Sequence, residues 1–276
     1  MRTVRLLNAI RRAIAEVTNV NGLFPRQVFG NKPRATSDDY LSLWALGKQS
    51  KPNFVSLFET DQGFEVDSTW LDELALQTQV VVKKSAPNWM HGRILYSLLC
   101  SFAQEQKKGS HLNVLETGTA RGFSALCLAK ALNDVGACGQ VISIDALPHN
   151  VKMYWNCIAD ADGPTTRESL LANWPDERNR VLFVQGWSEM QIAHLGISRI
   201  HFAFLDGEHT EKAVMKEFNW ISERQEAGDI IVFDDVSHSE PGVFRAVKRI
   251  ETDSRYQVKI LGDTIGRSYA VARRTE

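Results

Sequence analysis

The sequence predicts an α/β protein built on a seven-stranded, mostly parallel sheet that ends in an antiparallel hairpin. Short apolar runs alternate with helical patterns from residue 113 onward, as is typical of parallel strands joined by helices. Two extended runs close the chain on either side of a Gly262 to Gly266 turn, which predicts the hairpin. Residues 1–85 lack this alternation, so we expect them to form a separate, mainly helical extension.

The elements of the sheet domain follow one another in a regular order. Short apolar runs predict strands, and apolar positions three or four residues apart predict helices. The expected strands are 113–117, 140–145, 180–185, 199–206, 229–234, 256–262 and 267–273. The expected helices are 122–134, 148–160, 188–194, 209–226 and 240–251.

Two segments stand outside this alternation. Residues 1–85 are expected to be an extension or cap, followed by a ligand-binding domain at 86–276. The extension opens with an amphipathic helix over residues 1–17, expected to pack on the protein's own body, because Arg11 and Arg12 interrupt the apolar core that a secretory signal needs. The connection 161–179 is longer than most helix-to-strand loops, and we expect a lid or a substrate wall there.

Composition excludes several classes of protein. With 276 residues, 43% hydrophobic and 24% charged, the chain can form one large core plus an extension. Its 32 basic and 33 acidic residues give no electrostatic footprint for nucleic acid, so we expect no nucleic-acid partner. We expect no integral membrane segment either. The four cysteines show no zinc-like spacing and indicate free thiols in a reducing cytoplasm.

The turn after the first strand is the first candidate binding site. Gly118 and Gly122 let the backbone turn sharply, and the helix that follows offers unpaired N–H groups to a ligand. Glu116 stands at the end of the strand, where its carboxylate would repel a pyrophosphate and suits a ligand with an ammonium or sulfonium charge. The turn therefore indicates a nucleotide-like ligand other than a dinucleotide.

Polar residues at the next two strand ends extend this site. Ligands of open parallel sheets lie beyond the carboxyl ends of the strands. Asp145 lies at such an end and could accept two ribose hydroxyls or cap the following helix. In the turn Gly186-Trp187-Ser188, glycine would allow close approach of a flat ring, and Trp187 could pack on that ring or simply belong to the core or surface.

Three carboxylates at the fourth and fifth strand ends form the most specific chemical signal. Asp206 ends one strand, and Asp234 and Asp235 end the next. Facing one cavity they would repel one another unless a cation neutralised them, and an all-oxygen set suits Mg²⁺, Mn²⁺ or Ca²⁺. The alternative is that Asp206 and Asp235 cap helices while Asp234 is solvated.

Two histidines are candidates for a catalytic base. His209 lies three residues after Asp206, where an imidazole could take a proton in the same cavity, or could simply be exposed. His238, three residues after Asp235, is the competing candidate.

The motifs together resemble the Rossmann-like, class I S-adenosylmethionine-dependent methyltransferases, in particular small-molecule O-methyltransferases of the macrocin and cephalosporin-biosynthesis type. The resemblance covers about residues 90–273. It rests on the ordered series Val114-Leu-Glu-Thr-Gly-Thr-Ala-Arg-Gly-Phe-Ser124, Ile142-Ser-Ile-Asp145, Asp206-Gly-Glu-His209 and Val232-Phe-Asp-Asp235. The commonest loop of this class has a glycine where Ala120 stands.

The resemblance implies a role for each group of residues. It places the methionine end of the cofactor at the first turn, its ribose at Asp145 and its adenine at the third strand end. It implies a divalent metal at the three aspartates, with His209 as the base that prepares a hydroxyl for methylation. Relatives use such extensions for lids or oligomer contacts, so a homo-oligomer is one expected arrangement. The implied cofactor-binding residues are Glu116, Gly118, Thr119, Gly122, Ser124, Asp145, Gly186, Trp187, Ser188 and Asp206.

Three other functions remain open on the sequence. The first is a methyltransferase that needs no metal. The second is a nicotinamide-dependent oxidoreductase, although Gly118 to Gly122 does not supply the Gly-x-Gly-x-x-Gly pattern that such a site expects. The third is a cofactor-binding protein without turnover.

Overall fold

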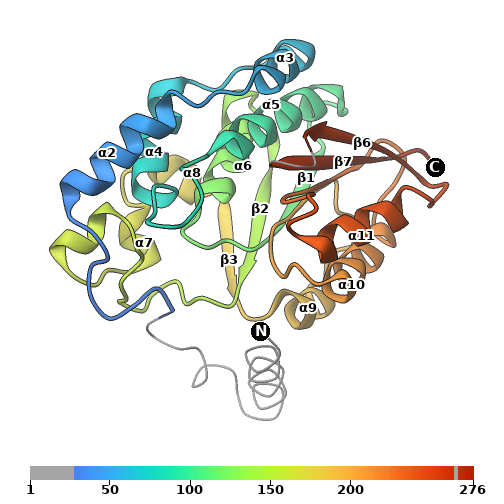
Figure 1. The fold of residues 1–276 in the computed structure, drawn as a ribbon. Helices are drawn as coiled ribbons and strands as arrows, with labels where there is room; N and C mark the ends of the chain where they lie inside the picture. The colour runs from blue at the N-terminus through green and yellow to red at the C-terminus, as the bar shows by residue number, and fades with distance from the viewer. Residues whose placement is uncertain (1–27, 264–266) are drawn as a thin grey trace.

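A twisted sheet of seven strands forms the centre of the computed structural model, which describes residues 28–263 and 267–276 (Figure 1). The strand order is β3-β2-β1-β4-β5-β7-β6, with every neighbouring pair from β3 to β5 parallel and β7 antiparallel to both its neighbours. The predicted sheet and hairpin are confirmed. The strands are β1 His111–Thr117, β2 Cys138–Asp145, β3 Val181–Gln185, β4 Phe202–Leu205, β5 Ile230–Phe233, β6 Tyr256–Gly262 and β7 Ser268–Arg274.

Successive side chains of the central strands point into two different cores because strand side chains alternate between the faces of a sheet. On β4, Phe202 and Phe204 enter the core shared with α5 and α6, whereas Ala203 and Leu205 enter the core shared with α10 and α11. The sheet is therefore covered on both faces, and its edge at the carboxyl ends of the strands is left for a ligand.

The helices form two layers around the sheet (Figure 1). None of the helices among the described residues combines the length and apolar character needed to cross a bilayer. The helical segments are α2 Ser37–Lys48, α3 Asn53–Gln62, α4 Ser68–Thr78, α5 Met90–Glu105, α6 Phe123–Asp134, η2 Ile158–Asp162, α7 Arg167–Leu170, α8 Pro175–Arg178, α9 Ser188–Gln191, η3 Ile192–His194, α10 Glu211–Ser222 and α11 Pro241–Ile250.

The described part of the extension is helical, as expected, and shares a core with the sheet domain. Tyr40 of α2, Val55 of α3 and Leu71 of α4 are buried in the same cluster as Leu126 of α6. The amphipathic helix expected at residues 1–17 lies outside the described residues. The division at residue 85 stays a prediction.

The helix predicted at 148–160 is wrong. That stretch is irregular up to the short 3₁₀ helix η2, and Met153 pairs with Thr165 in an isolated antiparallel bridge. Asn156 adopts φ +54°, outside the right-handed helical region, and the Asp160 carboxylate accepts hydrogen bonds from the backbone N–H groups of Trp155 and Asn156. Side-chain capping of those N–H groups replaces the bonds that a helix would make.

Candidate active site

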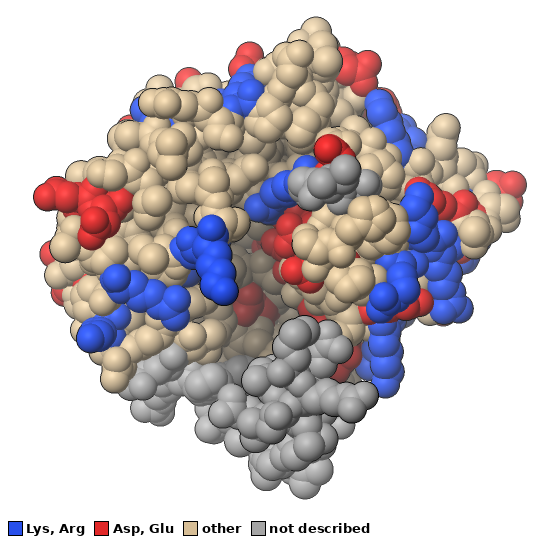
Figure 2. All heavy atoms as spheres, viewed as in Figure 1, with Lys and Arg blue, Asp and Glu red and all other residues tan. Residues whose placement is uncertain are grey.

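A cavity of about 260 Å³ opens at the carboxyl ends of β1, β2, β3 and β4. In the space-filling view this face is hollowed near its centre, and acidic side chains gather along the hollow (Figure 2). The cavity lies where the chain order reverses between β1 and β4, the usual ligand position in open α/β sheets. Its lining is Gly118, Ala120, Ile144, Asp145, Ala146, Leu147, Gly186, Trp187, Ser188, Glu189, Asp206, Gly207, Glu208 and Ala213.

Gly118 lets the ends of β1 and β4 approach each other at the cavity. Its φ is +93°, and a Cβ at this position would lie 2.0 Å from the backbone oxygen of Asp206. Both the backbone conformation and the close approach therefore require glycine.

Gly118→Ala is expected to destabilise the protein by roughly 1–3 kcal/mol more than Gly228→Ala, because overpacking is added to the backbone strain. Gly228 is a matched control, since its φ is +95° and its added Cβ would meet nothing within 4 Å. Urea denaturation of both variants measures the difference. Equal losses of stability would show that the contact with Asp206 is unimportant.

Glu116 lies beneath the cavity and does not line it. The side chain is fully buried, and its two carboxylate oxygens accept hydrogen bonds from the hydroxyls of Ser124 and Ser143. Thr119 Oγ1 in turn lies 2.5 Å from Ser143 Oγ. Burial raises the pKa of Glu116 to about 7 despite these hydrogen bonds. Of the three residues that the resemblance assigns to the methionine end, Glu116, Gly118 and Gly122, only Gly118 lines the cavity; Gly122 caps α6. Thr119 and Ser124, the other implied cofactor-binding residues of this loop, do not line it.

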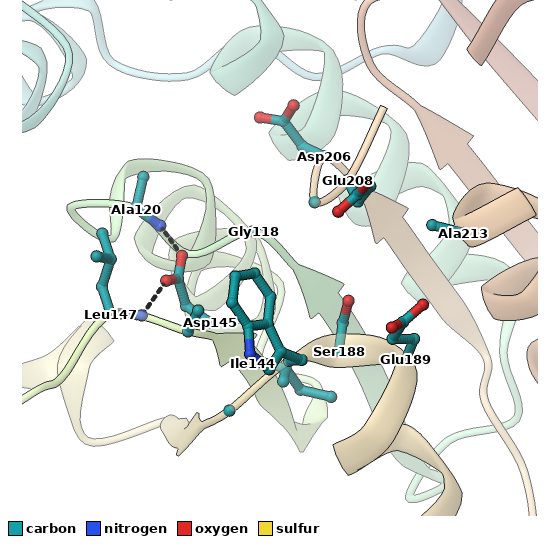
Figure 3. A pocket seen from close by; sticks show the side chains of 14 residues that line it. Gly118, Ala120, Ile144, Asp145, Leu147, Ser188, Glu189, Asp206, Glu208 and Ala213 are labelled. Carbon is teal, nitrogen blue, oxygen red and sulfur yellow. Dashed lines mark hydrogen bonds between the residues drawn. The ribbon is translucent and has the colours of Figure 1, made fainter. Parts of the chain in front are cut away.

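Asp145 faces the cavity and holds the loop opposite it (Figure 3). One carboxylate oxygen accepts a hydrogen bond from the backbone N–H of Ala120 at 2.6 Å, and the other accepts from Leu147 N–H at 2.5 Å. A carboxylate has about four acceptor positions, so two remain for ligand hydroxyls. Ala120 itself adopts φ +46°, the left-handed conformation in which a glycine would be less strained.

The turn after β3 forms the other wall of the cavity. Gly186, Trp187 and Ser188 all line it, as predicted from their place at a strand end. Ser188 donates a hydrogen bond to Glu217, a buried carboxylate of α10 that also accepts from Thr117 Oγ1 at 3.1 Å. These contacts tie the turn to α10 and to the end of β1.

His209 brings the acidic residues of two strand ends together. Its Nε2 lies 3.4 Å from Asp206 Oδ1, and its Nδ1 lies 3.9 Å from Asp235 Oδ2 and 3.4 Å from Glu240 Oε2. The hydrogen bond to Asp206 raises the pKa of His209 to about 9. Donor atoms of Asp206, His209 and Asp235 lie within 4.8 Å of one another, a spacing that could hold a metal ion.

Asp234 is turned away from this cluster. Its buried carboxylate pairs with Arg267 of the β6–β7 hairpin, 2.5 Å from Nη2, and accepts a hydrogen bond from the Asp235 backbone N–H. Charge attraction to Arg267 helps to keep the pKa of Asp234 below its usual value although the group is buried. The donor atoms that lie close together are thus those of two aspartates and a histidine, and an imidazole is a less typical ligand of Mg²⁺ or Ca²⁺ than a carboxylate.

The competing base lies farther out. His238 is exposed and packs against Phe244, with ring centroids 4.4 Å apart. Glu240 approaches His209 from that loop instead. Sequence reasoning missed Glu240 and Arg267, which carry no motif of their own.

The fold is that of the class I, Rossmann-like methyltransferases. The family profile described as a methyltransferase domain matches residues 115–236, the stretch from β1 to just beyond β5. Residues 115–236 of this chain therefore match a methyltransferase domain, as the resemblance of the motifs to the class I methyltransferases predicts. No curated protein matches the chain.

Solved structures share the fold at low sequence identity. Cofactor-bound Rv0187 from MTB is 18% identical, with a TM-score of 0.55 over 82% of this chain and 100% of its own. The O-methyltransferase TomG from Streptomyces achromogenes, solved with SAM, is 19% identical, with a TM-score of 0.52 over 77% of this chain and 92% of its own. The O-methyltransferase NovP is 15% identical, with a TM-score of 0.53 over 76% of this chain and 99% of its own.

Proposed function

We propose that this protein transfers the methyl group of S-adenosylmethionine to a hydroxyl of a small molecule, a sugar or natural-product scaffold with neighbouring oxygens. One observation carries the proposal. Asp145, the turn 186–188 and Asp206 all line the same cavity, and His209 lies directly beyond Asp206. Donor-binding and proton-accepting groups thus meet at one edge of the sheet. The SAM-bound O-methyltransferase TomG, which has the same fold, supports the choice of donor and acceptor atom.

The chemistry follows from the positions of these groups. Asp145 has acceptor positions for the ribose hydroxyls, and the turn after β3 lies where a flat ring can pack. His209 would take the proton of the acceptor hydroxyl. S-adenosylmethionine, when bound, would supply the methyl group to that oxygen and would be left as the neutral thioether. A cofactor whose positive charge lay near Asp206 would lower the pKa of His209 and would thereby favour the neutral imidazole that can accept a proton.

A divalent cation at Asp206 and Asp235 is the metal-assisted form of the proposal, with Mg²⁺, Mn²⁺ or Ca²⁺ as candidates. Asp234, the third ligand expected from the sequence, pairs with Arg267 instead. When bound, such an ion would lower the pKa of the acceptor hydroxyl. The structure also favours a metal-independent form, because Arg267 neutralises Asp234 and His209 lies among the other carboxylates. Turnover that survives EDTA and ignores added Mg²⁺ or Mn²⁺ would favour the second form.

Calorimetry with the purified chain tests the donor. We expect S-adenosylhomocysteine to bind and NAD to show no heat of binding. Tight binding of NAD with none of S-adenosylhomocysteine would replace the proposal with an oxidoreductase. Binding of S-adenosylhomocysteine without methyl transfer to any of a panel of hydroxyl compounds would favour a cofactor-binding protein without turnover.

Location and assembly are further parts of the proposal. A reducing cytoplasm fits four free cysteines, three of them buried. A homo-oligomer formed through the extension is supported by exposed Leu46 of α2 and Leu57 of α3, whose apolar side chains are 56% and 65% exposed. Sedimentation equilibrium measures the assembly directly.

A further inference from the structure

Arg167 is a buried cation that the proposed methyl transfer leaves without a role. It comes from α7, in the long connection between β2 and β3, and only 2% of the residue is exposed. Its Nε donates a hydrogen bond to the backbone oxygen of Ala120 at 2.8 Å. Its Nη2 has no hydrogen-bond partner and lies 3.7 Å from Asp145 Oδ1. A buried guanidinium in such a position needs a physical explanation.

Arg167 and Asp145 both hold Ala120, in the loop 118–122 between β1 and α6. The backbone N–H of Ala120 donates to Asp145, while the backbone oxygen of the same residue accepts from Arg167. Both peptide groups of a residue in the left-handed conformation are therefore held by side chains. Such a conformation persists only where its surroundings fix it.

Neighbours of Arg167 in the same connection support the rest of the loop. Arg121 Nε donates to the backbone oxygen of Trp155 at 2.6 Å. Leu171 packs under Gly122, where an added Cβ would lie 2.7 Å from Leu171 Cδ1. The connection between β2 and β3 thus contacts Ala120, Arg121 and Gly122, three consecutive residues of the loop, and supports the loop. The lid or substrate wall expected at 161–179 stays a prediction for the exposed residues of that segment.

We propose that Arg167 is a positioning residue for the cofactor, which fixes the loop at Ala120 relative to the carboxylate of Asp145. The loop at Ala120 and the Asp145 carboxylate then have a fixed geometry before the ligand binds, so binding requires little further ordering of the protein. This inference rests on the proposed function, because Asp145 is taken as the acceptor of the ribose hydroxyls.

The test compares Arg167→Met with Arg180→Met. Arg180 is a matched control, because its Nη1 also donates to backbone oxygens, those of Ala137 and Gly139 at the start of β2, away from the cavity. Calorimetry with S-adenosylhomocysteine, well below both melting temperatures, should show a 10-fold to 100-fold rise in Kd for Arg167→Met, the usual value of a charge-assisted hydrogen bond. Arg180→Met should bind like the wild type.

Two further measurements separate positioning from a general structural role. In an Asp145→Asn background, Arg167→Met should cost much less affinity than it does alone, because the two side chains act together. Hydrogen exchange of the ligand-free protein should show faster exchange of the 118–122 backbone in Arg167→Met only. If Arg167→Met does not fold, Arg167→Lys replaces it in both measurements. We expect Arg167→Lys to lose less affinity for S-adenosylhomocysteine and to show faster exchange of the same 118–122 backbone.

The outcomes distinguish this inference from the proposed function. If the wild type binds S-adenosylhomocysteine and Arg167→Met binds it equally well, the role of Arg167 is wrong. Equal losses in Arg167→Met and Arg180→Met would also overturn it. If the wild type does not bind S-adenosylhomocysteine, the proposed function fails, while the exchange measurement still decides whether Arg167 fixes the loop.

Discussion

Replacing His209 with alanine is expected to lower kcat about 10²-fold to 10⁴-fold, the usual contribution of a general base. The imidazole lies beyond Asp206, next to the cavity and outside its lining. Its removal should therefore leave the affinity for S-adenosylhomocysteine nearly unchanged. The measurement is the initial rate of transfer of a labelled methyl group to an acceptor found by screening hydroxyl compounds, with and without EDTA.

His238→Ala is the matched control for this experiment. The side chain is a second histidine of the same sheet edge, but it is exposed and packs on Phe244. We expect its replacement to change kcat little. Loss of turnover in His238→Ala with retention in His209→Ala would assign the base to the other histidine. Loss of cofactor affinity in His209→Ala would instead make it a binding residue.

The stability of the ligand-free protein is expected to fall as pH rises from about 4.5 to 7, in part because of Glu116. Burial raises the pKa of this carboxyl from 4.5 to about 7. Across this interval the unfolded chain releases the proton while the folded chain keeps it, so rising pH favours unfolding. The shift corresponds to a loss on the order of 3 kcal/mol, complete above pH 7.

Glu116→Gln should remove this part of the pH dependence, because the amide stays neutral at every pH. Urea denaturation at pH 5 and pH 8 gives the free energy of unfolding for wild type and variant. Glu217→Gln should act similarly, since burial also raises the pKa of Glu217 to about 7. Glu223→Gln, whose side chain is 72% exposed, is the control and should leave the pH dependence as it is. An unchanged slope in Glu116→Gln would mean that the carboxyl ionises normally.

Much of the fold could be predicted because it depends on local patterns. Strands β3 and β5 were predicted to within one residue and β1 to within two, since apolar runs between turn residues are a strong signal. The predicted helix at 148–160 was wrong because backbone hydrogen bonds to the Asp160 carboxylate and the left-handed conformation of Asn156 override the apolar periodicity. The arrangement of α2, α3 and α4 depends on distant contacts, such as that of the Tyr40 hydroxyl with Asn156 at 3.1 Å, which no local pattern encodes.

The candidate site was predictable for residues that directly follow the parallel strands, because the carboxyl ends of these strands lie at one edge of the sheet. Asp145, Asp206, His209 and Asp235 lie at that edge of the sheet, as expected from their positions after the strands. The pairing of Asp234 with Arg267 was not predictable, because Arg267 lies just before β7, a hairpin strand that returns beside β5 from far along the chain.

Nor did any sequence signal identify Arg167. The unusual length of its connection was the only indication that this segment matters. Its contacts with Ala120 and Asp145 join separate parts of the chain, which no local pattern encodes.

The distribution of the thiols offers a practical consequence for spectroscopy. Burial raises the pKa of Cys157 to about 11 and also raises those of Cys100 and Cys127, so these three thiols should be slow to form reactive thiolates. Cys138 is exposed at the start of β2, the end of the strand remote from the cavity. A maleimide fluorophore should therefore attach to the natural sequence at this one position, giving a reporter for assembly or surface immobilisation that leaves the cofactor cavity free.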